Sequence, residues 1–197
     1  MQEGMLCHTL LAEESGVYVQ QVLAHLTEKL NIGAFEQAWQ RIIEQHDILR
    51  MSVELDGSEK PLQKFHSVVE LPLEQQDWSG LPPVEQNERL NAYLEYDRAK
   101  GFALDEAPLM RLALFKMGAA DYRFVWTNHH ALLDGRSRVL VLKELFALYE
   151  ALNHGSSLEL KPARPYRDYL SWLRTQDLSK AERSGRTCWK AFLHPRD

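Results

Sequence analysis

The feature that most constrains the fold is a strand, a tight turn and a helix that follow one another in the middle of the chain. Residues 122–128 alternate in the way expected of a half-buried strand. Residues 129–135 then read His-His-Ala-Leu-Leu-Asp-Gly, and residues 138–153 form an amphipathic helical pattern that ends before Gly155. Two histidines at a strand end and an aspartate at a helix start are a common setting for catalytic groups.

The remaining patterns predict strands interleaved with helices. Further strands are expected at Val17–Leu30, Leu49–Leu55, Lys60–His66 and Leu109–Met117, with Asp56-Gly57 as a hairpin turn. Further helices are expected from an Asn31 cap to His46, and at Val84–Lys100, Tyr166–Thr175 and Lys180–Phe192. Leu71–Pro83 holds three prolines and is expected to be a loop. The pattern indicates an α/β (α+β) fold with a mixed, mainly antiparallel sheet and helices packed on one face.

The composition narrows the class of protein. With 197 residues, 45% of them hydrophobic and 26% charged, residues 1–197 suit a single globular domain. A net charge of -5 does not indicate the excess of basic residues that is typical of nucleic-acid-binding proteins. No apolar run reaches the roughly 20 residues of a membrane helix, and the N-terminus is unlike a signal peptide. Cys7 and Cys188 form no metal or redox motif, so a cytoplasmic protein with two reduced thiols is expected.

The paired histidines favour proton transfer over metal binding. Neighbouring side chains on a strand point to opposite faces, so His129 and His130 cannot both face one ligand without a local break. Zinc sites need three or four protein ligands, and beyond one histidine and Asp134 no third is evident. We therefore expect one histidine in an active-site channel and the other in the core. A neutral imidazole, with an ordinary pKa of about 6.5, can accept a proton from an attacking amine, hydroxyl or thiol.

The residues around the histidines favour direct acyl transfer. The chain has no Gly-x-Ser-x-Gly motif, so nothing supports an acyl-enzyme formed on serine. Asp134 is expected to pair with an arginine or to cap the following helix, and Gly135 to permit a tight backbone turn. The residues alone leave a second interpretation open, in which His129, His130 and Asp134 only satisfy one another and the backbone.

The same run resembles the HHxxxDG signature of the condensation domains of nonribosomal peptide synthetases. This family shares the signature with chloramphenicol-acetyltransferase-like acyltransferases. Four other segments resemble condensation-domain motifs, in the same order and across essentially the whole chain: Gln2–His8, Gln45–Arg50, Phe102–Leu109 and Tyr169–Glu182.

The resemblance implies a chloramphenicol-acetyltransferase-like two-layer sandwich that forms the N-terminal lobe of a condensation domain, with the second lobe absent from residues 1–197. It implies that an acyl thioester on one carrier protein is transferred to the amine of an aminoacyl group on another, both held by phosphopantetheine arms. His130 is then the base or positions the amine, His129 belongs to the same motif, Asp134 pairs with an arginine, and Gly135 makes space. No metal or bound cofactor is implied. The implied partners are carrier domains, a second lobe and neighbouring synthetase domains.

One departure from the motifs concerns the aspartate. The second condensation motif usually reads Arg-His-x-x-Leu-Arg, and here Gln45 replaces the first arginine while Arg50 remains. If the missing arginine normally pairs with the aspartate, Asp134 needs another cation. Arg50, Arg136 and Arg138 are the candidates.

Two other functions remain open at this point. The chain could transfer an acyl group from coenzyme A or a carrier thioester to a small-molecule alcohol or amine, using the same histidine. Alternatively, it could be a non-catalytic module that docks carrier proteins, an interpretation motivated by Gln45 and by the absent lobe.

Overall fold

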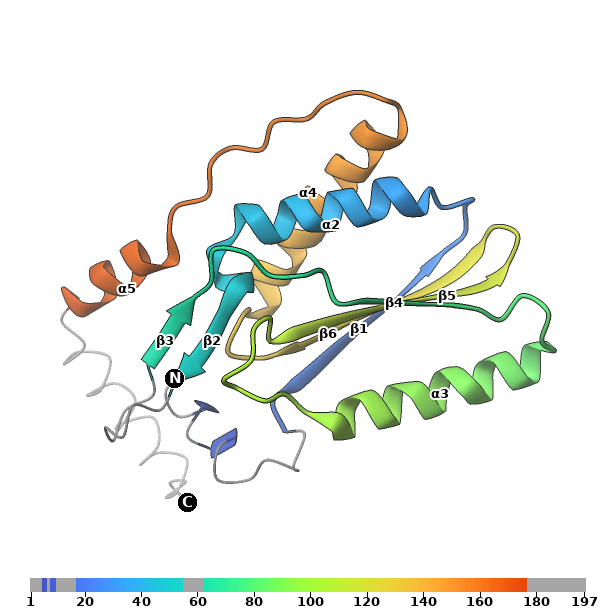
Figure 1. Ribbon diagram of the computed structural model, residues 1–197, viewed down its shortest axis with the longest axis horizontal. Coiled ribbons are helices and arrows are strands. Elements are labelled where there is room, and N and C mark those ends of the chain that lie inside the picture. The colour runs from blue at the N-terminus through green and yellow to red at the C-terminus, as the bar shows by residue number, and fades with distance from the viewer. Residues whose placement is uncertain (1–4, 7, 10–16, 55–61, 177–197) are drawn as a thin grey trace, which may run out of the picture. The chain divides into compact units, whose positions relative to one another are not determined.

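The computed structural model describes residues 5–6, 8–9, 17–54 and 62–176 (Figure 1). The chain divides into two compact units, residues 1–163 and 164–197. In the second unit, helix α5 (Tyr166–Arg174) carries a row of aromatic rings, with Tyr169 stacked on Trp172 at a centroid distance of 5.9 Å. The predicted helix at 180–192 lies outside the described residues. Among the described residues, no helix is long and apolar enough to cross a membrane.

The first unit is built on a four-stranded sheet in the order β1-β6-β5-β4. Strands β1 (Val19–Leu26), β6 (Asp121–His129) and β5 (Met110–Gly118) are antiparallel, and β4 (Leu73–Asp77) lies parallel to β5. This mixed, mainly antiparallel sheet confirms the predicted fold class. The β5–β6 hairpin has hydrophobic side chains on both faces, so the sheet is suited to be covered from both sides.

Strand β4 corrects the prediction of a loop over residues 71–83. Its sequence, Leu-Glu-Gln-Gln-Asp, has no β-branched or aromatic residue and lies close to Pro72. The strand forms because β5 offers an edge to pair with. Leu112 N–H donates to Pro72 O at 2.9 Å, and Trp78 N–H donates to Lys116 O at 2.8 Å.

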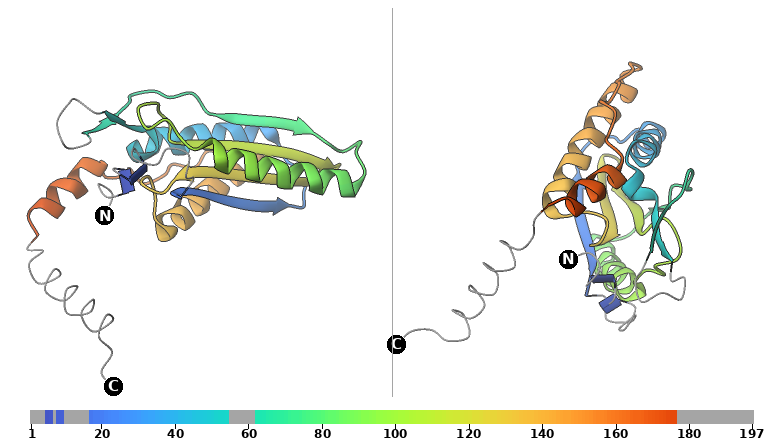
Figure 2. Two further views of the ribbon diagram at one scale, coloured as in Figure 1. Left: turned by 90° about the horizontal axis from the view of Figure 1, so that it is seen from below. Right: turned by 90° about the vertical axis from the view of Figure 1, so that its left-hand side faces the viewer.

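Helices cover both faces of the sheet, which corrects the prediction that they lie on one face. Helices α2 (Ile32–Gln45) and α4 (Gly135–Asn153) lie together on one side (Figure 1). There the Trp39 ring meets Trp126 at 5.1 Å. Helix α3 (Pro83–Lys100) lies on the opposite side (Figure 2). There its Leu90 packs in one cluster with Phe115 and Val125. Because neighbouring strand residues face opposite ways, Val125 and Trp126 mark the two faces.

The cap predicted at Asn31 agrees with the structure. Asn31 caps α2, and its side-chain oxygen accepts a hydrogen bond from Ala34 N–H at 3.2 Å. A 3₁₀ turn, η2 (Asp47–Arg50), leads to a small antiparallel pair, β2 (Met51–Glu54) and β3 (Leu62–Phe65). The predicted Asp56-Gly57 turn between these strands lies outside the described residues.

Candidate active site

The histidine pair lies at the end of β6, between the ends of two neighbouring strands. His129 N–H donates to Leu109 O at 3.0 Å on the β5 side, and His130 N–H donates to Tyr18 O at 2.8 Å on the β1 side. The next hydrogen bond, from Leu132 N–H to His129 O at 3.0 Å, closes a tight turn. The central strand therefore fixes the backbone of both histidines before the chain enters α4.

His129 is a core residue whose ring is held at both nitrogens. Its exposed fraction is 1%, and Nδ1 lies 3.1 Å from Ala131 N–H, which donates to it. An accepting Nδ1 carries no proton, so Nε2–H donates to Thr9 Oγ1 at 3.0 Å. The Thr9 hydroxyl in turn donates to Met5 O at 2.9 Å. Burial, followed by the charge of His130, lowers the pKa of His129 to about 4, so this ring is neutral at pH 7.

The lowered pKa of His129 predicts a loss of stability in mild acid. The unfolded chain protonates this imidazole near its ordinary pKa of 6.5, whereas the folded chain resists protonation down to about 4. The unfolded state therefore binds more protons in this window, and the stability contributed by the neutral ring falls as pH drops from 6.5 to 4. We expect a loss on the order of 3 kcal/mol.

Urea unfolding of the wild-type chain and of His129→Gln at a series of pH values measures this loss. The difference in unfolding free energy between the two proteins should narrow as the pH falls, because glutamine does not titrate. A difference that stays constant across this window would contradict the assignment of His129 as a buried neutral ring.

His130 is arranged differently, with one nitrogen tied to the backbone and the other available. Its ring is partly buried, and Nδ1 lies 3.1 Å from Leu133 O. A carbonyl oxygen only accepts, so Nδ1 carries the proton and, in the neutral ring, Nε2 keeps its lone pair. Within the described residues, nothing donates a hydrogen bond to Nε2. The turn thus presents a nitrogen that can take a proton from a substrate group.

Asp134 caps helix α4 instead of pairing with an arginine. Its Oδ1 accepts from Ser137 N–H at 2.7 Å, and this hydrogen bond is the main cause that lowers the pKa of Asp134. Across the described residues, Asp134 forms no salt bridge, and Arg136 lowers its pKa through its backbone N–H and, to a smaller extent, through its charge. Arg50 is engaged elsewhere, because it donates to Glu44 O at 2.7 Å and to His66 O at 2.8 Å. Of the two roles expected for Asp134, the capping role is the one observed here.

Removing the cap should cost a measurable part of the stability. We expect Asp134→Ala to lower the unfolding free energy by about 1 kcal/mol, because the Ser137 N–H loses its partner. Asp134→Asn should keep most of it, because asparagine is also a good cap. Chemical denaturation of the three proteins measures this. Equal loss in both variants would show that the carboxylate charge, and not the cap, provides the stabilisation.

Gly135 does not have the backbone conformation that the sequence suggested. Among the described residues, positive φ occurs only at Gly101 and Gly155, so Gly135 adopts a backbone that any residue can adopt. A Cβ placed on Gly135 would lie 3.9 Å from Arg138 Nη2, an ordinary contact. The prediction that the turn requires glycine is therefore wrong. The reason is that Gly135 already belongs to the first turn of α4.

The sequence interpretation missed a buried ion pair next to His129. Asp97 is 2% exposed and accepts from Arg111 Nε at 2.8 Å. Arg111 also lies over the ring of Phe102, and the rings of Phe102 and His129 form a T-shaped pair with a centroid distance of 6.4 Å. A signal was available, because Arg111 stands among the apolar residues at the start of β5 and Asp97 follows Leu90 and Leu94 on the inward face of α3.

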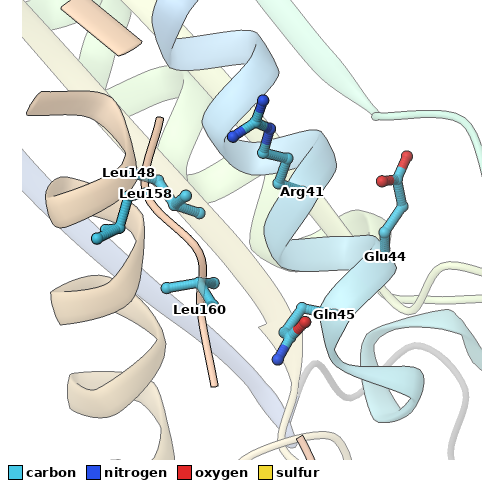
Figure 3. A pocket seen from close by; sticks show the side chains of 6 residues that line it. All are labelled: Arg41, Glu44, Gln45, Leu148, Leu158 and Leu160. Carbon is cyan, nitrogen blue, oxygen red and sulfur yellow. The ribbon is translucent and has the colours of Figure 1, made fainter. Parts of the chain in front are cut away.

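A separate surface pocket of about 250 Å³ lies between α2, α4 and the segment that follows α4 (Figure 3). Three leucines form its apolar wall opposite the end of α2, and its lining residues are Arg41, Glu44, Gln45, Leu148, Leu158 and Leu160. Neither histidine of the turn lines it. Over residues 5–6, 8–9, 17–54 and 62–176, no three His, Cys, Asp or Glu side chains gather as a candidate metal site.

Comparison with known proteins places this geometry in a family. The Condensation domain family matches residues 1–196. The chain is 44% identical over 195 residues to one of the subunits of linear gramicidin synthase from Brevibacillus parabrevis, covering 99% of this chain and 2% of the relative. It is 37% identical over 193 residues to bacitracin synthase 1 of Bacillus licheniformis, covering 98% of this chain and 4% of the relative.

A solved structure shares the fold. The starter condensation domain of rhizomide synthetase RzmA superposes with a TM-score of 0.77 at 20% sequence identity, covering 86% of this chain and 42% of that structure. The chain thus spans less than half of a solved condensation domain and a small fraction of the curated relatives. From the family match along nearly its whole length, together with the histidine turn at the end of β6, the chain belongs to the condensation-domain family.

Proposed function

We propose that this chain is the N-terminal lobe of a condensation domain that forms amide bonds in nonribosomal peptide synthesis. The observation that carries the proposal is the His130 ring, whose Nδ1–H is held by Leu133 O at 3.1 Å while Nε2 stays available. A neutral imidazole in this state is suited to accept the proton of an attacking amine. The relatives support the same function, since they are synthases for linear gramicidin and bacitracin.

The proposed reaction joins two carrier-bound groups. The amine of the aminoacyl acceptor attacks the donor thioester carbonyl, so a C–N bond forms and the C–S bond breaks. The proton lost by the amine passes to His130 Nε2 and from there to the departing thiolate of the donor phosphopantetheine arm. If His130 instead positions the amine, the same Nε2 accepts its hydrogen bond without taking the proton. The two roles differ in whether the ring takes up a proton during the reaction, because only a base does so.

The other residues of the motif are assigned supporting roles in this proposal. His129 holds the turn through Ala131 N–H, and Asp134 fixes the start of α4. Gly135 is assigned the role of leaving room for the incoming arm, at a position where a Cβ would make an ordinary contact with Arg138 Nη2 at 3.9 Å. Carrier domains, a second lobe and neighbouring synthetase domains are the proposed partners, and the second lobe would close the other side of the channel.

A carrier-loaded condensation assay tests the proposal. Donor and acceptor carriers are mixed with this chain, with and without a separately supplied second lobe, and the acceptor carrier is weighed by intact mass spectrometry. An acceptor that gains the mass of the donor acyl group supports the proposal. Transfer from a soluble coenzyme A thioester but from no carrier would indicate the alternative acyltransferase. Tight carrier binding without turnover, unaffected by His130→Ala, would indicate a docking module.

A further inference from the structure

We propose that Arg111 is a positioning residue for His130, acting through Phe102 and His129. The inference deepens the proposed function and rests on it, since it assigns a further residue to the same site. Arg111 lies on β5, on the sheet face covered by α3. No substrate contact is assigned to it. Arg111 acts by holding Phe102 in place, and the ring of Phe102 packs against His129.

The guanidinium of Arg111 is held in one geometry by three acceptors. Its Nε donates to Asp97 Oδ1 at 2.8 Å, its Nη2 to Asp97 O at 2.8 Å, and its Nη1 to Gly101 O at 2.6 Å. Two of these bonds go to backbone carbonyls at the end of α3 and just after it. Gly101, with φ 62°, turns the chain there through a conformation that favours glycine. Arg111 therefore fixes the backbone immediately before Phe102.

The partner of Arg111 is itself held across the sheet. Asp97 Oδ2 accepts from Thr127 Oγ1 at 2.5 Å and from Gln21 Nε2 at 2.9 Å. Thr127 is the register partner of both Gln21 on β1 and Arg111 on β5, so the three side chains form one row across three strands. A carboxylate that is 3% exposed and bound by each of these side chains has little freedom to move.

The ring of Phe102 connects this row to the histidines. The Arg111 Cζ lies 4.1 Å from the Phe102 ring centroid, a cation–π stacking distance. Phe102 then meets His129 at 6.4 Å with an interplanar angle of 89°. His129 Nδ1 in turn accepts from Ala131 N–H, inside the turn that carries His130. These three contacts link Arg111 to the turn, so a displaced Phe102 alters the support of the backbone that carries His130.

A lysine at position 111 distinguishes a positioning role from charge pairing alone. Lysine can keep a positive charge near Asp97, but it lacks the planar group that stacks on Phe102 and the fork that spans two carbonyls. Arg111→Lys should therefore retain the fold but lose the stacking on Phe102 and the hydrogen bonds to the two carbonyls. Phe102→Leu leaves the ion pair untouched and removes only the ring, so it carries the test even if Arg111→Lys does not fold.

Nitrogen-15 NMR of the histidine rings in this chain tests the inference without any acyl transfer. In the wild type we expect a single protonated Nδ1 at His130. In Arg111→Lys and Phe102→Leu we expect the Nδ1 and Nε2 resonances of His130 to shift toward each other, as the ring exchanges between tautomers. The matched control is Phe115→Leu, which removes a ring from the same α3-covered face, where it stacks on Trp78 at 4.2 Å.

The control variant should keep the wild-type His130 signals despite its loss of core packing. Wild-type His130 signals in a folded Phe102→Leu protein, or equal shifts in Phe115→Leu, would overturn the inference. Either result would leave the condensation assay unaffected. A second combination of results separates the two proposals. If the domain does not condense but Phe102→Leu still shifts the His130 resonances, the proposed function is contradicted and the positioning role of Arg111 is retained.

Discussion

Replacing His130 by alanine should lower kcat for carrier-to-carrier amide formation by about 10²- to 10⁴-fold, with little change in KM, in a domain completed by its second lobe. The loss is the usual size of the contribution from a general base. It follows from the geometry because His130 is the ring whose Nε2 stays available, whereas both nitrogens of His129 are occupied. Single-turnover transfer between loaded carriers, followed by intact mass, measures the rate.

His130→Asn is the matched variant for this prediction. The asparagine amide can still donate to Leu133 O, so the turn keeps its hydrogen bond while the base is gone. If His130 accepts the proton, this variant should be as slow as His130→Ala. If His130 only positions the amine, the amide oxygen can accept the hydrogen bond and activity should partly return. Wild-type rates in both variants would remove His130 from the mechanism.

Replacing Arg111 by methionine should cost about 3 kcal/mol of stability, as is typical when one partner of a buried ion pair is removed. The reason is the carboxylate left behind, because Asp97 is 3% exposed in the intact pair and, among the described residues, only Thr127 and Gln21 would still donate to its side chain. Methionine keeps much of the volume and flexibility of the side chain, so packing changes little. Urea unfolding at neutral pH gives the free energy directly.

The exposed ion pair on α3 provides the control for this experiment. Arg89 pairs with Glu85 at 2.8 Å, and about half of each side chain is exposed to solvent. Arg89→Met should therefore cost about 0.3–0.5 kcal/mol, the usual value of such a helix pair. The double variant Asp97→Asn/Arg111→Met should recover stability relative to Arg111→Met, because the unpaired charge is gone. Equal effects of Arg111→Met and Arg89→Met would contradict the assignment of a buried pair.

The elements that the sequence predicted well are those whose signals are local. The β5–β6 hairpin, the caps at Asn31 and Asp134, and helix α4 each depend on residues within a few positions of one another. Strand β4 was missed because its polar sequence becomes a strand only by pairing with β5, a tertiary effect. The side of the sheet that α3 covers was also missed, since a helix pattern gives the buried stripe and not its partner.

The candidate site divides in the same way. The sequence located the histidine turn and predicted one histidine in the core, but it could not tell which ring nitrogens were occupied. That information comes from Ala131 N–H and Leu133 O, which are backbone groups with no sequence signature. The Asp97–Arg111 pair joins residues 14 positions apart on different elements, so only the folded chain brings it beside Phe102.

The most direct test of the proposed role of His130 is its protonation state in this chain, measured by long-range proton–nitrogen NMR on histidine-labelled protein at neutral pH. We expect the neutral form of the His130 ring to carry its proton on Nδ1 and none on Nε2, beside a His129 ring of the opposite tautomer. A His130 ring protonated at Nε2 would contradict this role, because the nitrogen assigned to receive the amine proton would already carry one.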